Sequence, residues 1–524
     1  MCELRERVTM KSPSVPRLET WVLAAVCVGL RVVSLARSCL SDDEAIYAVV
    51  AREMLSGQAL YRDVVDHKPP LIYVVYGFTQ AVGGPRGGML LLHLLTIGVV
   101  FATALILSRI VRRFGGLSPD SRAPFWAALL YAVFTTTLLP FDALAANCEL
   151  FMMLPLAASV LFFLAGAGAL RLRPLFAAGL LVGIAMLFKY QAGVQLALYG
   201  SALVIAHWRR VPRVLLASLA IAAGVAIVLG AAFALMHHAR CLEAAWFWFR
   251  FNFAYIKTGF RLQDTLRRAA VRISFVVFPA AFLWILGAKS AVKALTTKPP
   301  EGSVNFFRFA TFWLVVSAFA ITTGGRFFGH YFHQVTAPLA VLAAPAAARL
   351  WQTRRRLVSA AVAVPAVAFF LVATLQGPVL AAASAPAPDY QRMVDLIDAY
   401  ARPGDSLVVW GNVPVLYFMA ERPLGTRFVF SNYMTGLSPA TPSQSDPAVD
   451  ASPNIVPESW DMFEADIAAR RPRLFVETSP GNVAAYGKFP PSNFPRLQAL
   501  LQRDYSLVGE AAGIRLLLLR ERRD

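Results

Sequence analysis

The chain has 524 residues, of which 57% are hydrophobic and 15% are charged, and its mean hydropathy is +0.56. These values lie outside the range of soluble globular proteins and predict an integral membrane protein. The formal net charge of +19 does not indicate nucleic-acid binding, because the basic residues form short clusters between apolar runs instead of one soluble basic face. We therefore expect no nucleic-acid partner.

Apolar runs long enough to cross about 30 Å of hydrocarbon predict roughly eleven transmembrane helices. The first run, from Trp21, follows a basic tail at residues 1–18 and has no small-residue cleavage site, so it is expected to remain as a span. The expected helices of this membrane core, residues 19–378, cover residues 19–37, 88–108, 123–139, 150–169, 174–188, 192–206, 213–235, 270–287, 306–323, 332–350 and 357–377.

Arginine and lysine collect in alternate loops, which the positive-inside rule places in the cytoplasm. The clusters contain Arg5, Arg7, Lys11, Arg17, Arg109, Arg112, Arg113, Arg171, Arg173, Arg209, Arg210, Arg213, Lys289, Lys293, Lys298, Arg354, Arg355 and Arg356. We expect a multi-pass protein of the cytoplasmic (inner) membrane, surrounded by membrane lipids, with a cytoplasmic N-terminus. The outer loops at residues 38–87, 140–149 and 324–333, and the chain after about residue 378, then face away from the cytoplasm.

The first outer loop opens with CLSDDEAIYAVVAREMLSG, which is rich in charge for so apolar a chain. Ser41 and Glu44 match a capping box, which predicts that a helix starts here. Asp42, Asp43 and Glu44 then lie beside the positive end of the helix dipole. Capping alone explains these acids without any chemistry, but it gives no reason for the nearby Arg52.

The same loop continues with DHKPPL, which predicts an anion site. Pro69 and Pro70 suit the first turn of a further helix, so Lys68 stands at the N-terminus of that helix. Free backbone amides, the dipole and an ammonium together favour an anion, most naturally a phosphate. An alternative of equal weight is that Lys68 extends to the lipid headgroups.

The later outer loops add acids and cations at the same membrane face. Asp142 and Glu149 lie in the second outer loop, and Glu149 stands at the start of the fourth span, where an acid is costly and usually functional. The penultimate outer loop, GGRFFGHYFHQ, contributes Arg326, His330, Tyr331 and His333. The spacing of these residues is not that of a metal cluster.

Two further segments outside the core spans carry structural predictions. The aromatic segment CLEAAWFWFRFNFAYIKTGF, from Cys241, suits a helix lying in the membrane interface, either as an anchor or to handle lipid. Cys39 and Cys148 flank the two acidic loops, and a disulfide between them is an alternative to two buried free thiols.

After an Ala-Pro-Ser linker the composition becomes that of a soluble domain, residues 379–524. Short apolar strands are predicted from Asp405, Thr426, Arg473 and Gly513, and helices from Tyr390, Ser459 and Phe494. The alternation indicates a small α/β domain on the outer face, with a flexible loop near residues 438–458.

The motif DDEAIYAVVAREMLSG, followed by DHKPPL and an acid in the next outer loop, resembles the GT-C glycosyltransferase superfamily. The closest resemblance is to its bacterial branch that is similar to protein O-mannosyltransferases and lipid A aminoarabinose transferases. It is strong over about residues 19–150 and weaker to about residue 350. The resemblance implies a polytopic GT-C-like fold and inverting transfer of a sugar from a polyprenyl-phosphate donor to an extracytoplasmic lipid, glycan or protein acceptor.

Residue by residue, the resemblance matches the first-loop acid of the family to Asp43 and its lysine to Lys68. Glu149 fits the second acid by its position at a helix start, and Asp142 is the alternative. The position before the lysine, often glutamate in the aminoarabinose branch, is His67 here, so the acceptor of that branch is not inferred.

The chemistry of an inverting transfer agrees with these matches. Asp43 would remove the acceptor proton, while Lys68, Arg326 and His330 would supply positive charge to the leaving phosphate. Glu149 would orient the acceptor or hold a divalent ion, although unclustered acids do not establish a metal site and no cofactor is certain. The residues expected to support the site are Asp42, Glu44, Arg52, His67 and Tyr331.

Two other classes of protein compete with this interpretation. A secondary transporter usually has internal repeats and charges near the bilayer midplane, whereas this chain has no convincing repeat and Lys189 is the chief charge away from a membrane face. A non-catalytic membrane protein built around the C-terminal domain leaves the first two outer loops unexplained.

Overall fold

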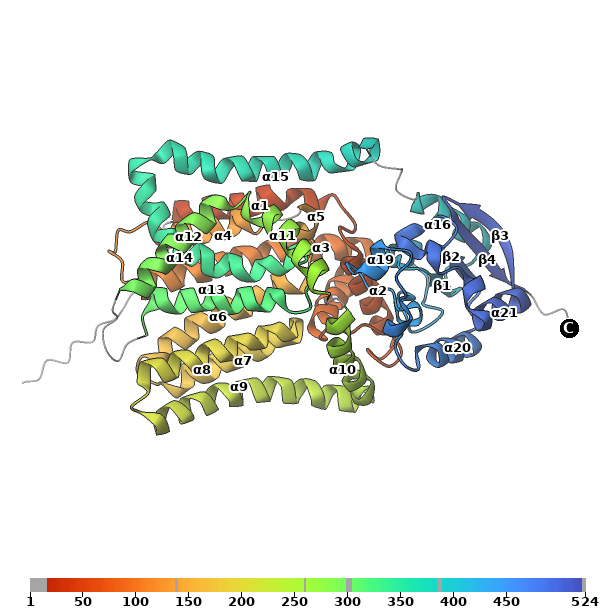
Figure 1. Cartoon of the computed structure of the whole chain (residues 1–524), viewed down its shortest axis with the longest axis horizontal. Coiled ribbons are helices and arrows are strands. Elements are labelled where there is room, and N and C mark those ends of the chain that lie inside the picture. The colour runs from red at the N-terminus through yellow and green to blue at the C-terminus, as the bar shows by residue number, and fades with distance from the viewer. Residues whose placement is uncertain (1–16, 137–139, 259–260, 298–303, 384–388, 521–524) are drawn as a thin grey trace, which may run out of the picture.

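The computed structural model describes residues 17–136, 140–258, 261–297, 304–383 and 389–520. Most of the N-terminal tail and Lys298 therefore lie outside the described residues. The chain forms a bundle of long helices joined to a smaller C-terminal α/β region (Figure 1).

The expected membrane spans coincide with helices of the bundle. These are α1 (Arg17–Leu35), α3 (Leu71–Phe114), α4 (Ala123–Phe134), α6 (Cys148–Ala167), α7 (Leu172–Phe188), α8 (Val194–His207), α9 (Val211–His238), α11 (Leu262–Val277), α12 (Ala281–Thr296), α13 (Phe306–Thr322), α14 (His333–Thr353) and α15 (Arg355–Ala383). Within the described residues, five helices are long and apolar enough to cross a membrane, or up to six if the bent pair α11 and α12 forms one span. The protein is thus a multi-pass membrane protein, although fewer of its described helices than the eleven predicted spans are both long and apolar enough to cross a membrane.

The predicted span at residues 270–287 is wrong as a single helix. The helix α11 ends at Val277 and α12 begins at Ala281, and the two meet at 97°. Pro279 lies in this break. Proline cannot continue a helix because its ring clashes with the preceding turn and it lacks a backbone N–H.

The helix α3 begins directly after Pro70, as the proline pair predicts, and joins the first outer loop to the second span. Its 44 residues are interrupted at Gly84, which has φ 71° and ψ −177°. A side chain at this position would be strained, so glycine permits the change of direction between the outer half of α3 and its membrane half.

Several short elements cover the end of the bundle that faces the C-terminal region. They are α2 (Asp42–Leu55), α5 (Pro140–Leu144), η1 (Tyr190–Gly193), α10 (Leu242–Thr258) and η2 (Gly329–Phe332). The predicted aromatic segment forms α10, which lies between the bundle and the C-terminal region in Figure 1. Its Trp248 is buried, with its ring 4.8 Å from that of Tyr433.

The C-terminal region contains one four-stranded sheet in the order β1-β2-β4-β3. The strands β1 and β2 are parallel, and the other two pairs are antiparallel. The elements are α16 (Tyr390–Tyr400), β1 (Leu407–Trp410), α17 (Pro414–Ala420), α18 (Asn432–Thr435), α19 (Pro442–Ser445), η3 (Ser452–Asn454), α20 (Ser459–Arg470), β2 (Leu474–Glu477), η4 (Val483–Lys488), η5 (Pro491–Asn493), α21 (Pro495–Asp504), β3 (Tyr505–Ala511) and β4 (Ile514–Leu519).

Three of the four predicted strands are present, and the one predicted from Thr426 is wrong. Instead of joining the sheet, this segment pairs with the first outer loop, where the Val65 amide donates to the Arg427 carbonyl at 2.8 Å. Val65 and Phe428 form an isolated parallel bridge. The apolar residues of this segment are thus buried against another part of the chain, while β3, which was not predicted, completes the sheet.

The basic turns lie at one end of the bundle and the C-terminal region at the other. Figure 1 shows the turns between α8 and α9 and between α14 and α15 at the end away from the sheet. This separation agrees with the alternation of basic loops in the sequence.

We therefore predict that the C-terminal region lies outside the cytoplasm. A reporter that is active only in the cytoplasm should be silent when fused after Asp524. The same reporter fused after Arg210, in the basic turn between α8 and α9, should be active. Strong activity of the Asp524 fusion would reverse the predicted orientation.

Candidate active site

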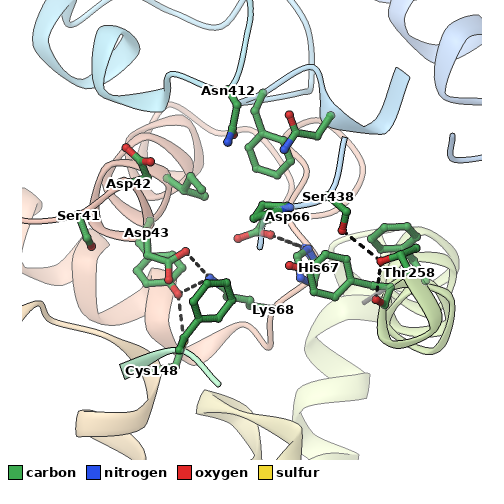
Figure 2. Close-up of a pocket in the computed structure, with 18 of the residues that line it drawn as sticks. Ser41, Asp42, Asp43, Asp66, His67, Lys68, Cys148, Thr258, Asn412 and Ser438 are labelled. Atoms are coloured by element: carbon green, nitrogen blue, oxygen red, sulfur yellow. Dashed lines mark hydrogen bonds and ion pairs between the residues drawn. The ribbon is translucent and has the colours of Figure 1, made fainter. Parts of the chain in front are cut away.

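A cavity of about 340 Å³ lies between the outer end of the bundle and the C-terminal region. The bundle contributes its charged and polar floor: Ser41, Asp42, Asp43, Tyr47, Asp66, His67, Lys68, Asp142, Cys148, Glu149, Lys189, His330 and Tyr331. Figure 2 shows residues of the first outer loop and of the C-terminal region around this space. The loops that the sequence singles out therefore do meet at one site.

The capping box predicted at Ser41 is present, with one change. The Ser41 hydroxyl accepts the Glu44 amide at 3.2 Å, and α2 starts at Asp42. The Glu44 carboxylate accepts the Leu40 amide at 2.7 Å instead of the Ser41 amide. Capping fixes the start of α2 and thereby sets where Asp43 stands.

Glu44 is fully buried and supports the site without lining it. Its Oε1 accepts the Ala146 amide at 2.7 Å and lies 3.2 Å from Nε2 of His93 on α3. Its carboxylate therefore joins α2 to α3 and to the second acidic loop.

Lys68 points at carboxylates on the cavity floor. Its Nζ donates to Oδ1 of Asp43 at 2.7 Å and to the Tyr47 hydroxyl at 2.5 Å. Burial lowers the pKa of the Lys68 ammonium, but the carboxylates of Asp43 and Asp66 outweigh burial and hold this pKa above its ordinary value. Lys68 is therefore a charged group of the site and, in this arrangement, not a headgroup anchor.

Asp43 is the more accessible of the two acids that the resemblance matches. Its side chain is 28% exposed, whereas that of Glu149 is 2% exposed. Its Oδ1 accepts from Lys68, and its Oδ2 has no hydrogen-bond partner within the described part of the chain. This second oxygen is free to accept a proton.

Asp142 and Glu149 form a second charged group with His330 and Lys189. Nδ1 of His330 lies 2.5 Å from Oδ1 of Asp142, and the His330 amide donates to Oδ2 at 3.1 Å. Nε2 of His330 lies 3.7 Å from Oε1 of Glu149, which also pairs with the Lys189 ammonium. Both acids considered for the second loop thus belong to the site.

The pKa values of this group follow from its pairing. Burial lowers the pKa of His330, but the carboxylates of Asp142 and Glu149 outweigh burial and raise it above 6.5. Burial raises the pKa of Asp142, but the charge and hydrogen bonds of His330 lower it from 3.8 to about 2. Both shifts therefore favour a protonated imidazole facing an ionised carboxylate.

Arg326 lies behind the site and does not line the cavity. Its Nη2 donates to the Tyr255 carbonyl at 3.1 Å and to the hydroxyls of Thr258 and Ser438, each at 2.9 Å. Its Nη1 donates to the Pro439 carbonyl. The guanidinium expected at the phosphate instead joins α10 to the C-terminal region.

Of the remaining expected residues, one lies away from the cavity and three line it. Arg52 donates to the carbonyls of Tyr417 and Arg422, at 3.2 and 2.7 Å, and does not reach the cavity. Asp42, which is exposed, and His67 line the cavity. Tyr331 also lines it, and the Lys189 ammonium lies 3.8 Å from the centre of its ring.

Three site residues were not assigned from the sequence. Asp66 accepts from the His67 amide and the Tyr73 hydroxyl, both at 2.7 Å, and its place inside the DHKPPL motif could have drawn attention to it. Lys189 stands in the turn after α7 and holds Glu149. Tyr47 contacts Lys68, but a tyrosine in the middle of a predicted helix gives no such signal.

Arg31 supports the site from inside the bundle. It is 1% exposed on the span α1, and its Nη1 donates to the Ala143 carbonyl at 3.2 Å, next to Asp142. A charge within an apolar span was the signal that could have identified it.

The disulfide considered between Cys39 and Cys148 is absent, and both are free thiols. Sγ of Cys39 lies 3.2 Å from the Ser41 carbonyl, and Sγ of Cys148 lies 3.5 Å from the Tyr47 hydroxyl. Capping of α2 and packing on the cavity floor hold the two thiols at different places.

No group of three His, Cys, Asp or Glu side chains within the described ranges could hold a metal ion. Asp43, Asp142 and Glu149 instead pair with Lys68, His330 and Lys189. We therefore derive no step through a divalent ion.

Comparison with known proteins gives similarity in structure only. No family model and no curated protein matches the chain. The crystal structure of ArnT from Cupriavidus metallidurans bound to undecaprenyl phosphate is similar with a TM-score of 0.57 and 15% identity, over 95% of this chain and 97% of that one. The chain has a GT-C-like fold.

A second similar fold supports the same conclusion. The oligosaccharyltransferase of Archaeoglobus fulgidus, in its complex with zinc and sulfate, gives a TM-score of 0.51 and 15% identity, over 93% of this chain and 71% of that one. Its apo form gives a TM-score of 0.51 and 14% identity, over 97% and 74%. The GT-C-like fold thus extends over nearly the whole chain, including the C-terminal region.

The His330 pairing predicts a pH-dependent stability. Because the pKa of folded His330 lies above 6.5, the pairing contributes fully below about pH 6.5 and is lost as pH rises through the folded value. The Tm of the purified parent should fall as the pH rises from about 6.5 through the pKa of folded His330. In His330→Gln this fall in Tm should be missing. His207→Gln, which removes a buried histidine at the other end of the bundle, is the control. An unchanged pH dependence in His330→Gln would contradict the assignment.

Proposed function

We propose that the chain is an inverting glycosyltransferase that moves a sugar from a polyprenyl-phosphate donor to a lipid, glycan or protein acceptor on the extracytoplasmic face. The observation that carries the proposal is the Asp43–Lys68 pair, which places an accessible carboxylate and an ammonium 2.7 Å apart on the floor of one cavity. The GT-C-like fold supports it, since ArnT was solved with undecaprenyl phosphate.

Asp43 acts as the base. The acceptor hydroxyl attacks C1 of the donor sugar from the face opposite the phosphate, so the C1–O bond forms with inversion as the C1–O(phosphate) bond breaks. The acceptor proton moves to the free Oδ2 of Asp43. General bases placed in this way contribute roughly 10²- to 10⁴-fold to the rate.

Lys68 holds the phosphate of the donor. The leaving polyprenyl phosphate carries its own negative charge and needs cations more than a proton donor. When the phosphate binds the ammonium, Asp43 shares this cation with the phosphate. Donor binding and proton transfer are thereby coupled through Lys68.

In the second charged group, Glu149 orients the acceptor. His330, which is paired with Asp142, lies at the cavity beside Glu149 and in its protonated form adds positive charge for the leaving group. Lys189 keeps Glu149 in place. Arg326 takes no direct part, because its guanidinium is occupied by α10 and residues 438–439.

No observation favours the transporter or the non-catalytic alternative. Transfer of radiolabel from polyprenyl-phosphate sugars to a lipid, glycan or protein fraction, in membranes containing the chain, tests the proposal directly. The proposal would be refuted if none of the three fractions gained more label than the same fraction from membranes that lack the chain.

We predict that Asp43→Asn lowers transfer by about 100-fold or more, because the base is lost. Binding of undecaprenyl phosphate should persist, since the amide leaves Lys68 free. Ser41→Ala is the matched comparison: it removes the cap of the same helix, should cost about 1 kcal/mol of stability, and should lower transfer far less than Asp43→Asn because the base remains. Equal and mild effects of the two changes would leave Asp43 as a capping residue only.

We predict that Lys68→Met weakens binding of undecaprenyl phosphate by roughly ten- to hundred-fold, the equivalent of about 1.5–3 kcal/mol for a lost charged contact. The change also leaves Asp43 unpaired, which repels the phosphate. Lys68→Arg should be tolerated only partly, because a planar fork differs from a point charge. Lys293→Met, an exposed lysine on α12, is the control, and parent-like affinity in Lys68→Met would place the phosphate elsewhere.

A further inference from the structure

The cavity has a charged floor and an uncharged roof. The bundle contributes the acids, lysines and His330 described above. The C-terminal region lines the opposite side with neutral side chains, and its polar members are Asn412, Asn432, Tyr433, Ser438, Gln444 and Asn454. None of its described lining residues is charged. The two sides of the cavity therefore suit different chemical groups.

Two roof amides are fixed through their oxygen atoms. Oδ1 of Asn432 accepts the Tyr486 hydroxyl at 2.8 Å, and Oε1 of Gln444 accepts the Ala440 amide at 2.6 Å. Their NH₂ groups have no hydrogen-bond acceptor among the residues that the structure describes. Each side chain is held in orientation and retains two N–H donors.

The other two amides retain acceptors. Nδ2 of Asn454 donates to the Gly436 carbonyl at 3.3 Å, which leaves its Oδ1 without a partner in the described ranges. Asn412 lies two residues after the end of β1 and has no hydrogen bond within those ranges, so it retains both its donors and its acceptor. Figure 2 shows it projecting from the C-terminal region toward the side where Asp43 and Asp66 lie.

The loop that carries Gln444 and Asn454 packs tightly against the segment before it. Gly436 has φ +70°, and a Cβ there would lie 1.9 Å from the Ala451 carbonyl oxygen. Only glycine at residue 436 allows this segment to pack so tightly against the second arm of the predicted loop, residues 438–458. Asn454 donates to the Gly436 carbonyl in the same contact.

Oriented neutral donors and acceptors match hydroxyl groups, since a hydroxyl both donates and accepts. A phosphate or a carboxylate would need cations or donors alone. The rings of Phe430 and Tyr433 line the same roof and offer apolar faces to a sugar ring. A structural role for the amides explains the bonds that fix them but not the free ends that remain at the cavity.

We propose that Asn412, Asn432, Gln444 and Asn454 form a subsite for the hydroxyl groups of a neutral sugar ring. The inference rests on the proposed function. It assigns the phosphate to the floor and sugar recognition to the C-terminal region. The ring belongs either to the donor or to a glycan acceptor, which present the same chemistry.

The test compares ligands that differ only in the sugar. Binding of undecaprenyl phosphate, an undecaprenyl-phosphate hexose and an undecaprenyl-phosphate pentose is measured with the purified full chain. Asn412→Ala is the first variant, because Asn412 makes no internal hydrogen bond, and Asn412→Ala with Gln444→Ala is the second. Asn493→Ala is the matched control, since this exposed amide of the same region does not line the cavity.

If the subsite binds the donor sugar, the parent binds at least one sugar-bearing lipid more tightly than undecaprenyl phosphate. Asn412→Ala should then weaken that binding about three- to ten-fold, and the double variant further, while affinity for undecaprenyl phosphate stays unchanged. Unchanged affinity for the sugar-free lipid also shows that the variants are folded.

If the subsite binds the acceptor, all lipid affinities stay unchanged and the membrane concentration for half-maximal radiolabel transfer rises by a similar factor. If the lipid affinities and the membrane concentration for half-maximal transfer both match the parent in both variants, the proposed subsite is wrong. Absence of undecaprenyl-phosphate binding and of transfer in the parent would instead refute the proposed function, so the two failures are distinguishable.

Discussion

The buried carboxylate of Glu44 is the interaction on which the geometry of the site depends. It accepts the backbone amides of Leu40 and Ala146 and contacts His93, so it joins α2, α3 and the second acidic loop. A buried carboxylate without partners would cost several kcal/mol, and this cost selects the arrangement in which all three partners are present. Because α2 carries Asp43 and the acidic loop leads to Glu149, Glu44 fixes the distance between the two charged groups.

The two charged groups of the site are paired internally before any substrate binds. Each acid of the two groups faces a cation of the same cavity, since an unpaired charge is costly in a partly desolvated space. In the proposed function, an arriving phosphate must therefore compete with carboxylates for Lys68 and His330. This competition would weaken donor binding and couple it to Asp43 through the shared Lys68.

Local signals predicted the parts of the fold that local physics determines. The capping box located the start of α2, the proline pair located the start of α3, and apolar runs located the bundle helices. The contacts that complete the site join distant positions, such as Glu149 with Lys189 and Val65 with Arg427. No periodicity or cap encodes these pairs.

Arg326 was expected at the phosphate and the segment from Thr426 in the sheet. Both predictions were wrong because the partners of these residues lie far away in the sequence, on α10, residues 438–439 and the first outer loop.

Arg326 shows how a residue outside the cavity can still govern it. Its guanidinium joins the Tyr255 carbonyl and the Thr258 hydroxyl on α10 to Ser438 and Pro439 on the roof. α10 in turn contacts the floor, because Asn252 donates to the His67 carbonyl at 3.0 Å. Hydrogen bonds from the first outer loop through α10 to the roof therefore hold the floor and the roof of the cavity at a fixed separation. A multi-pass bundle and a small α/β region can share one site only if such a connection holds them at a fixed separation.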